Sequence, residues 1–117
     1  MAKRLTVSEQ EFIKDRLSYW QGKLGQIKWD IRLRYEDVLE GSRAETECRE
    51  KDSLAVITFS KQFDEEWDET ALDKTCFHEV CEVKYWLLRT FLAEDIANTI
   101  IHEWIRTDEN IIYPLLK

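Results

Sequence analysis

Apolar side chains recur with a helical period near both ends of the chain and with a period of two in the middle. The first helical stretch is Ser8–Gly22, in which Ser8 and Glu11 have the spacing of a capping box. Its predicted buried stripe consists of Phe12, Ile13, Leu17 and Trp20. We therefore expect the chain to begin with a helix that packs on the core.

Three stretches in the middle of the chain are predicted to be strands. Lys28–Val38 alternates between apolar and polar positions, which is typical of a half-buried strand. Ala44–Glu50 alternates weakly and carries many charges, as expected of an edge strand. Leu54–Phe59 is apolar almost throughout and predicts the most buried strand. Because short turns join the three strands, we expect an antiparallel meander.

The longest stretch that predicts a buried helix is Leu72–Phe91, with Asp68 or Thr70 placed to cap it. A helix that is apolar on two faces usually packs on both sides. One apolar stripe consists of Leu72, Cys76, Val80, Val83, Leu87 and Phe91, and the neighbouring one of Phe77, Cys81, Tyr85 and Leu88. This helix is therefore expected to be the central one of the fold.

A last helix is predicted over Ala93–Glu109, followed by the short apolar tail Ile111–Lys117, in which Pro114 should block a further helical turn. The order of elements is then α-β-β-β-α-α. This order predicts an α+β fold, a three-stranded antiparallel meander with helices packed on one face. With 117 residues and no glycine- or proline-rich linker, residues 1–117 are expected to form a single domain.

The balance of charges narrows the class of partner. The chain has 24 acidic and 17 basic residues, a net charge of −7. A protein that follows nucleic-acid phosphates needs a basic surface, so we expect no direct nucleic-acid binding. The acidic clusters predict a solvated surface, and the alternative is a surface that meets a basic partner or mimics DNA.

The setting predicted for this chain is a cytoplasm. Met1–Gln10 lacks the apolar segment of a signal peptide, and no run of residues reaches the length of a membrane-spanning helix. The three cysteines, Cys48, Cys76 and Cys81, are expected to be reduced thiols, and the absence of a C-x-x-C pair argues against a structural thiolate zinc site.

Candidate chemistry lies on the predicted central helix. His78 and Glu82 are four residues apart, so they share a face one turn apart, and Glu79 is adjacent. A buried helix that directs a histidine and two carboxylates toward one cleft indicates a metal or catalytic site. The alternative is a half-buried histidine that is hydrogen-bonded to Glu82.

With Phe77–Glu82 on the helix that follows the third strand, the chain resembles a compact zincin. More narrowly, it resembles the small phage-encoded metallopeptidase-like proteins, which have an N-terminal helix, a W-x-I/L strand, a meander, an active-site helix with H-E-x-x-H and a closing helix. The matching parts are Trp29–Ile31, Leu54–Phe59, His78–Glu79 and Ile100–Pro114. The resemblance implies a zincin-like domain, a peptidase that uses zinc or another divalent metal, a protein or peptide partner, and a host cytoplasm as its location.

Carried over residue by residue, the motif makes His78 the first metal ligand and Glu79 the catalytic general base. The second ligand position holds Glu82 in place of histidine, so the motif is a divergent H-E-x-x-E. A carboxylate can bind zinc, but it makes the site harder and more favourable to magnesium, manganese or iron. A third ligand must come from elsewhere.

Two residues are candidates for the third ligand. Glu94 is the first choice, because helical spacing places it on the apolar face of the last helix, where an unpaired carboxylate is costly. Its alternative role is an ordinary acidic residue in a first helical turn. His102, the second histidine of the chain, is the other candidate, with a surface position as the alternative.

The sequence is also compatible with a function that does not involve catalysis. The alternatives are that the same scaffold is inactive and binds a host protein, for example as its inhibitor, or that it acts as an acidic DNA mimic. Trp67 and Trp86 are the aromatic residues proposed for such contacts, with core packing as the alternative. Trp86 lies one turn beyond Glu82 and is also placed to form a wall of the metal cleft.

Overall fold

The computed structural model describes residues 3–37, 39, 43–63 and 68–117 of the chain. The strands are β1 (Lys3–Arg4), β2 (Asp30–Glu36), β3 (Ala44–Arg49), β4 (Leu54–Ser60) and β5 (Gln62–Phe63). The helices are α1 (Val7–Lys23), α2 (Glu69–Lys84), α3 (Leu88–Phe91) and α4 (Glu94–Leu116), with a 3-10 turn, η1, over Glu50–Asp52. The fold is α+β, as predicted.

The main sheet is mixed, with the strand order β2-β4-β3. β3 and β4 form an antiparallel hairpin through η1 and Ser53, which has a left-handed conformation with φ 51°. β2 lies on the other side of β4 and runs parallel to it, so the predicted antiparallel meander is wrong. The continuous apolar sequence of β4 reflects a strand between two neighbours, and apolar periodicity carries no information on strand direction. β3 is an edge strand, as predicted.

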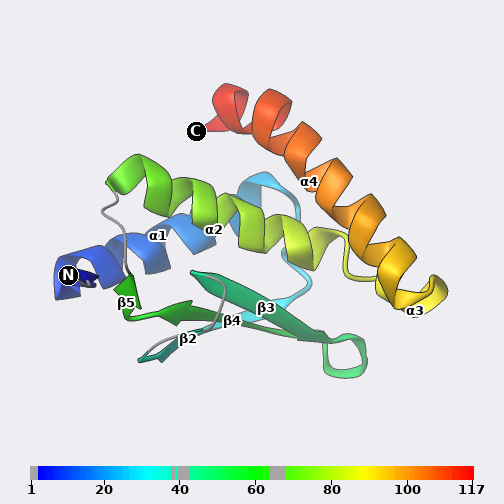
Figure 1. The fold of residues 1–117 in the computed structure, drawn as a ribbon, viewed down its shortest axis with the longest axis horizontal. Coiled ribbons are helices and arrows are strands. Elements are labelled where there is room, and N and C mark those ends of the chain that lie inside the picture. The colour runs from blue at the N-terminus through cyan, green and yellow to red at the C-terminus, as the bar shows by residue number, and fades with distance from the viewer. Residues whose placement is uncertain (1–2, 38, 40–42, 64–67) are drawn as a thin grey trace.

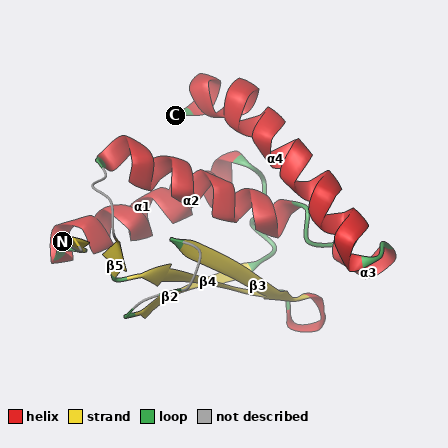
Figure 2. Ribbon diagram, in the orientation of Figure 1, coloured by secondary structure: helices red, strands yellow, loops and turns green. Residues whose placement is uncertain are grey.

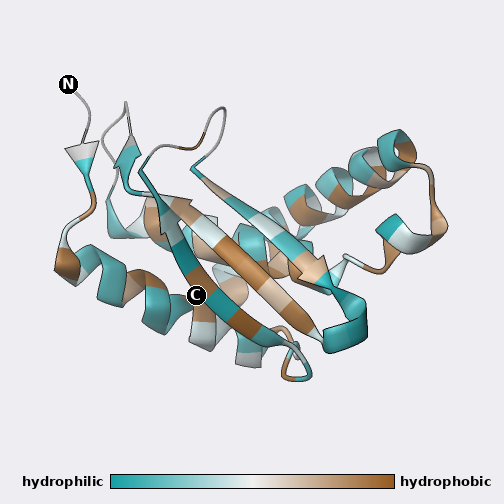
Figure 3. Cartoon of the chain, turned by 90° about the horizontal axis from the view of Figure 1, so that it is seen from below, coloured by the Kyte–Doolittle hydropathy of each residue, from teal (hydrophilic) through white to brown (hydrophobic). Residues whose placement is uncertain are grey.

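The helices lie on one face of this sheet, with α1 and α2 nearest to it and α4 beyond α2 (Figures 1 and 2). The side chains of β4 that point toward the helices, Ala55, Ile57 and Phe59, are fully buried. β4 is the most hydrophobic of the three strands when the open face is viewed (Figure 3). A two-stranded ribbon of β1 and β5 was not expected, because two-residue strands leave no periodic signal.

The predicted central helix is shorter than Leu72–Phe91. α2 begins after Asp68, whose side chain accepts a hydrogen bond from the Ala71 amide, and it ends at Lys84. The chain then turns at Tyr85, and the last part of the predicted helix forms the separate helix α3. Nine residues of α2 are buried, so the expected central position is confirmed.

Both terminal helices differ from their predicted bounds. In α1 the capping box is formed by Thr6 and Glu9, two residues before the predicted pair, and each side chain binds the other's backbone amide. α4 continues through Pro114 to Leu116, so Pro114 does not block the helix. Tertiary contacts hold this last turn, because the Tyr19 hydroxyl donates to the Leu116 carbonyl.

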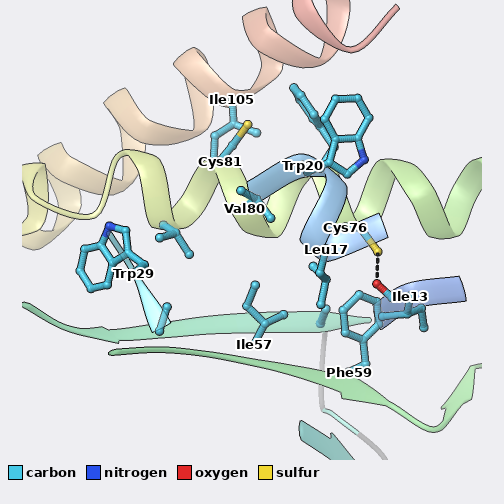
Figure 4. Close-up of a cluster of buried hydrophobic side chains, with 14 of the residues drawn as sticks. Ile13, Leu17, Trp20, Trp29, Ile57, Phe59, Cys76, Val80, Cys81 and Ile105 are labelled. Carbon is cyan, nitrogen blue, oxygen red and sulfur yellow. Dashed lines mark hydrogen bonds between the residues drawn. The ribbon is translucent and has the colours of Figure 1, made fainter. Parts of the chain in front are cut away.

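One hydrophobic core lies between the sheet and the helices (Figure 4). Trp20, Phe59 and Phe77 are its largest fully buried side chains. All three cysteines are buried and free, as expected. Burial raises the pKa of the Cys48 thiol to about 12 and raises the pKa values of Cys76 and Cys81 further. Among the described residues, no helix combines the length and the apolar character needed to cross a membrane.

Candidate functional site

The candidate site lies where the second half of α2 meets α4 and the edge strand β3. α2 supplies His78, Glu79 and Glu82, and α4 supplies His102. The amphipathic character of α4 explains this arrangement, because its apolar residues pack on α2 while His102 lies on the neighbouring polar flank. The packing of α4 on α2 thus brings together His78 and His102, which are 24 positions apart in the chain.

Glu82 is the centre of the cluster. Its residue is only 8% exposed, and Arg89 donates a hydrogen bond from Nη2 to Oε2 over 3.1 Å. The other carboxylate oxygen, Oε1, is buried and has no hydrogen-bond partner among the described residues. It lies 4.0 Å from His78 Nε2 and 3.7 Å from His102 Nε2. An acceptor without a donor therefore lies between two imidazole nitrogens.

His78 contacts a carboxylate on each side. Its Nδ1 lies 3.5 Å from Glu109 Oε2, and its Nε2 is directed toward Glu82. Burial acts to lower the pKa of His78, but the Glu109 hydrogen bond and the charges of Glu79, Glu109 and Glu82 outweigh it, and the pKa is raised. Glu109 is thus placed to orient the ring and to hold a proton on Nδ1.

Glu79 is a buried carboxyl group beside this cluster. Its residue is 6% exposed, and the Thr46 hydroxyl on β3 donates to its Oε1 over 2.8 Å. Burial raises the pKa of Glu79 to about 7, although the His78 charge and the Thr46 hydrogen bond act in the opposite direction. A carboxyl group with this pKa is suited to accept a proton near neutral pH.

His78, Glu79 and Glu109 line an open cleft of about 380 Å³ between the start of β3 and α2. Lys74 and Arg43 also line it. Larger grooves, of about 420 and 550 Å³, lie on the open face of the sheet and between α1 and β2. Neither is lined by a histidine or by a buried carboxyl group, so the smaller cleft is the better candidate site.

The two candidates for a third ligand have different positions. His102 is more than half exposed, yet its Nε2 reaches Glu82, so the structure brings it together with His78 and Glu82. Glu94 is exposed in the first turn of α4, and within the described structure it takes no part in these contacts. The predicted position of Glu94 on the buried apolar face is therefore wrong, because the first turn of α4 is exposed at this residue.

Two residues of this region, Arg89 and Thr46, gave no signal in the sequence. Arg89 donates to both Glu82 and Asn98, and its guanidinium lies 5.0 Å from the centre of the Trp86 ring. Trp86 is half-buried and supports Arg89, while Trp67 lies outside the described residues. Thr46 could not be expected to reach Glu79 without knowledge of how α2 crosses β3. Glu109 did share the polar flank of the last helix with His102, which is a weak signal.

The donor set fits a divalent metal in its chemistry, and its spacing is slightly too wide. Two imidazoles and one carboxylate form a known ligand set for catalytic zinc. Donor atoms bound to one tetrahedral zinc ion lie about 3.4 Å apart, roughly half an ångström closer than the pairs around Glu82. As the side chains stand, the described residues contain no group of three or more His, Cys, Asp or Glu arranged to hold a metal ion. Small side-chain rotations would be needed to form such a centre.

Comparisons with protein-family models, with curated proteins and with solved structures found no match to this chain.

Proposed function

We propose that this protein is a metal-dependent hydrolase of the peptidase type. His78, Glu82 and His102 would hold a divalent ion such as zinc, and Glu79 would be the general base. The observation that carries the proposal is the buried Oε1 atom of Glu82, which has no hydrogen-bond donor among the described residues and lies near two imidazole nitrogens.

A bound cation would remove an energetic cost at this point. Leaving a buried polar atom unsatisfied costs about 1–3 kcal/mol, and more when the group is charged. Glu109 favours the His78 tautomer with its proton on Nδ1, which leaves the Nε2 lone pair directed toward Glu82. Arg89 holds Glu82 Oε2, so Oε1 is the oxygen presented to the two histidines.

Glu79 has the properties that a general base requires. Its Oε1 accepts the Thr46 hydroxyl, so Oε2 is the oxygen that would take a proton from the attacking water. A divalent ion in this set would lower the pKa of its bound water and polarise a substrate carbonyl. The cleft beside Glu79 is open to solvent and would admit an extended peptide or a similar chain.

The metal content of untagged protein tests the proposal. We expect about one equivalent of zinc or another divalent ion by mass spectrometry, and its loss in His78→Ala and in His102→Ala. Glu94→Gln is the matched control and should retain the metal. Because ligation needs a neutral imidazole, affinity should also fall as the pH is lowered through the raised pKa of His78.

Catalysis is tested separately with Glu79→Gln. This variant should keep its metal and lose about 100-fold or more of the hydrolytic rate on unstructured peptide substrates. Metal-free parent protein, with zinc added in excess and still unbound, would refute the hydrolase proposal. The protein would then be better regarded as an inactive scaffold that binds a partner.

A further inference from the structure

One face of the main sheet is left open by the rest of the described chain. The helices lie on its other side (Figure 1), so the side chains that point away from them form an open face, seen directly in Figure 3. Its middle column, from β4, consists of Leu54, Val56 and Thr58, which line a groove of about 420 Å³. Charged residues of β2 and β3 flank this column. An apolar centre with a charged rim is the usual arrangement of a protein interface.

The charges of the two flanking strands are arranged in rows. Alternate residues of β2 and of β3 point to the open face. The strand registers place them level with β4 in three rows: Asp30–Leu54–Arg49, Arg32–Val56–Glu47 and Arg34–Thr58–Glu45. In every row the β2 residue and the β3 residue have opposite charges. The signs along β2 are therefore negative, positive, positive, and those along β3 are positive, negative, negative.

These charges are only weakly engaged within one chain. Arg34, Glu45 and Glu47 are exposed and form no ion pair within the part of the chain that the structure describes. The two other arginines form exposed ion pairs, Arg32–Asp30 over 3.1 Å and Arg49–Asp52 over 3.8 Å. Exposed pairs of this kind contribute little to stability, so they can be exchanged for contacts with a partner.

A second copy of the same face is a complementary partner. Consider a two-fold axis that runs along β4, midway between two open faces. It turns one face over the other and keeps every row at its own level, so β2 of one copy faces β3 of the other. Each row then joins opposite charges twice: Asp30 with Arg49, Arg32 with Glu47, and Arg34 with Glu45. Sliding along the strands would break the two-fold symmetry, so the register is fixed as well.

The other aligned arrangement fits less well. A two-fold axis across the strands sets β2 against β2 and β3 against β3, with their directions reversed. Centred on Val56, it opposes Arg32 to Arg32 and Glu47 to Glu47, and centred nearer Thr58 it opposes like charges in both rows that it joins. Centred nearer Leu54, it joins only two of the three rows. The charges therefore favour the axis along β4.

We propose that two copies of this chain pack face to face through the open face of the sheet, about a two-fold axis along β4. The three strands cover roughly 15 Å by 20 Å, which is smaller than a standard stable interface, so the dimer is a weak one. β2 and β3 are edge strands, so their long side chains can lean outward and keep their charged ends near water. The cleft beside Glu79 lies on the helix side of the sheet, and the proposal does not depend on metal binding or on hydrolytic activity.

Sedimentation velocity over a range of protein concentrations tests the association. We expect a monomer–dimer equilibrium whose dissociation constant rises about 10-fold between about 0.05 and 0.5 M salt, because charge pairs at a solvated rim are screened. Arg34→Glu and Glu45→Arg should each raise the dissociation constant about 10-fold or more, since each places two pairs of like charges in the interface. Arg106→Glu is the matched control on α4, where its side chain is 72% exposed, and it should leave the equilibrium unchanged.

Mixing the two variants tests the orientation. When Arg34→Glu is combined with Glu45→Arg in one solution, both contacts between the two chains again join opposite charges, so a heterodimer should form with about the affinity of the parent. The axis across the strands predicts no such recovery, because it sets residue 34 against Asp30 and residue 45 against Arg49. Circular dichroism establishes that each variant is folded.

Three results would overturn the proposal. One is a parent that stays monomeric up to about 1 mM, including a monomer that binds a different protein or peptide at this face. Another is a dimer that is unaffected by both single variants. The third is a mixture of the two variants that stays as monomeric as each variant alone.

Discussion

Asp73 and Glu82 lie on the same helix and are buried to a similar degree, with 7% and 8% of each residue exposed, but their surroundings differ. Asp73 accepts hydrogen bonds from Arg16 Nε (2.7 Å), Arg16 Nη2 (3.3 Å), Trp20 Nε1 (2.8 Å) and the Tyr113 hydroxyl (2.9 Å). Both of its oxygens are satisfied, by donors from α1 and α4. Glu82 has one donor, Arg89, and an oxygen with none in the described structure.

The contrast separates a structural role from a functional one. A buried carboxylate whose oxygens are all satisfied joins the elements that donate to it, and Asp73 ties three helices together. A buried carboxylate that is left partly unsatisfied costs stability in the unbound protein, which is common at sites that bind a ligand. Glu82 has the hydrogen bonding of the second kind, and the ligand-binding role is the one we propose for it.

The largest expected effect is at Asp73. Asp73→Ala leaves Arg16, Trp20 and Tyr113 without their shared acceptor, and we expect the free energy of unfolding to fall by about 3–5 kcal/mol. Urea denaturation followed by tryptophan fluorescence measures this change. Asp30→Ala is the control, because the Asp30–Arg32 pair is exposed and should contribute no more than about 0.5 kcal/mol. Equal effects of the two substitutions would remove the structural role given to Asp73.

The next effect is a pH dependence at Glu79. The pKa of this carboxyl is about 7 in the folded protein, against an ordinary value of 4.5. Between these two values the folded state keeps a proton that the unfolded state has lost, so stability falls as the pH rises through this window. His78, whose pKa is also raised, acts in the same direction: its contribution is full below 6.5 and is lost as the pH rises through its folded pKa.

Glu79→Gln isolates this contribution, since glutamine resembles the protonated carboxyl and does not titrate. We expect the variant and the parent to be similarly stable below pH 4.5, and the variant to become more stable by up to about 3 kcal/mol above pH 7. Unfolding midpoints measured at several pH values provide the comparison. A constant difference across the window would show that the Glu79 environment is not as described, with His78, Thr46, Glu82 and Glu45 around it.

The smallest effect is expected at Glu82 in metal-free protein. Glu82→Gln replaces the unsatisfied oxygen with an amide that can donate to an imidazole, so the free energy of unfolding should change by about 1 kcal/mol or less. Adding zinc to about 100 times its dissociation constant should stabilise the parent by about 2.7 kcal/mol and leave the variant unaffected. If Glu82→Gln lowered the free energy of unfolding as much as Asp73→Ala, Glu82 would be a structural residue, and the contrast between the two carboxylates would not hold.

Much of the fold follows from local patterns, and the arrangement of the sheet does not. The alternation in Lys28–Val38 and the apolar run in Leu54–Phe59 are local features, and both became strands. The parallel pairing of β2 with β4 depends on how the chain passes from one edge of the sheet to the other, which side-chain period does not encode. The continuation of α4 past Pro114 depends on contacts with α1 and α2, which outweigh the helix-breaking tendency of proline.

In the candidate site too, some contacts follow from local sequence and others depend on tertiary packing. His78 and Glu82 share a face because helix geometry requires it, so their proximity could be predicted. The choice between Glu94 and His102 required the packing of α4 on α2, since both residues belong to one helix. Arg89 was beyond sequence reasoning, because it reaches Glu82 through the turn that ends α2, a turn not predicted at that position.

The three buried thiols give the folded protein a further property. A thiol reacts as its thiolate, so raised pKa values and burial protect Cys48, Cys76 and Cys81 from alkylation while their surroundings stay closed. Each should therefore be modified only when its own element opens. Cys48 would report the detachment of the edge strand, whereas Cys76 and Cys81 would report the opening of the central helix. The three thiols are thus expected to report local unfolding at two places in the fold, without any introduced label.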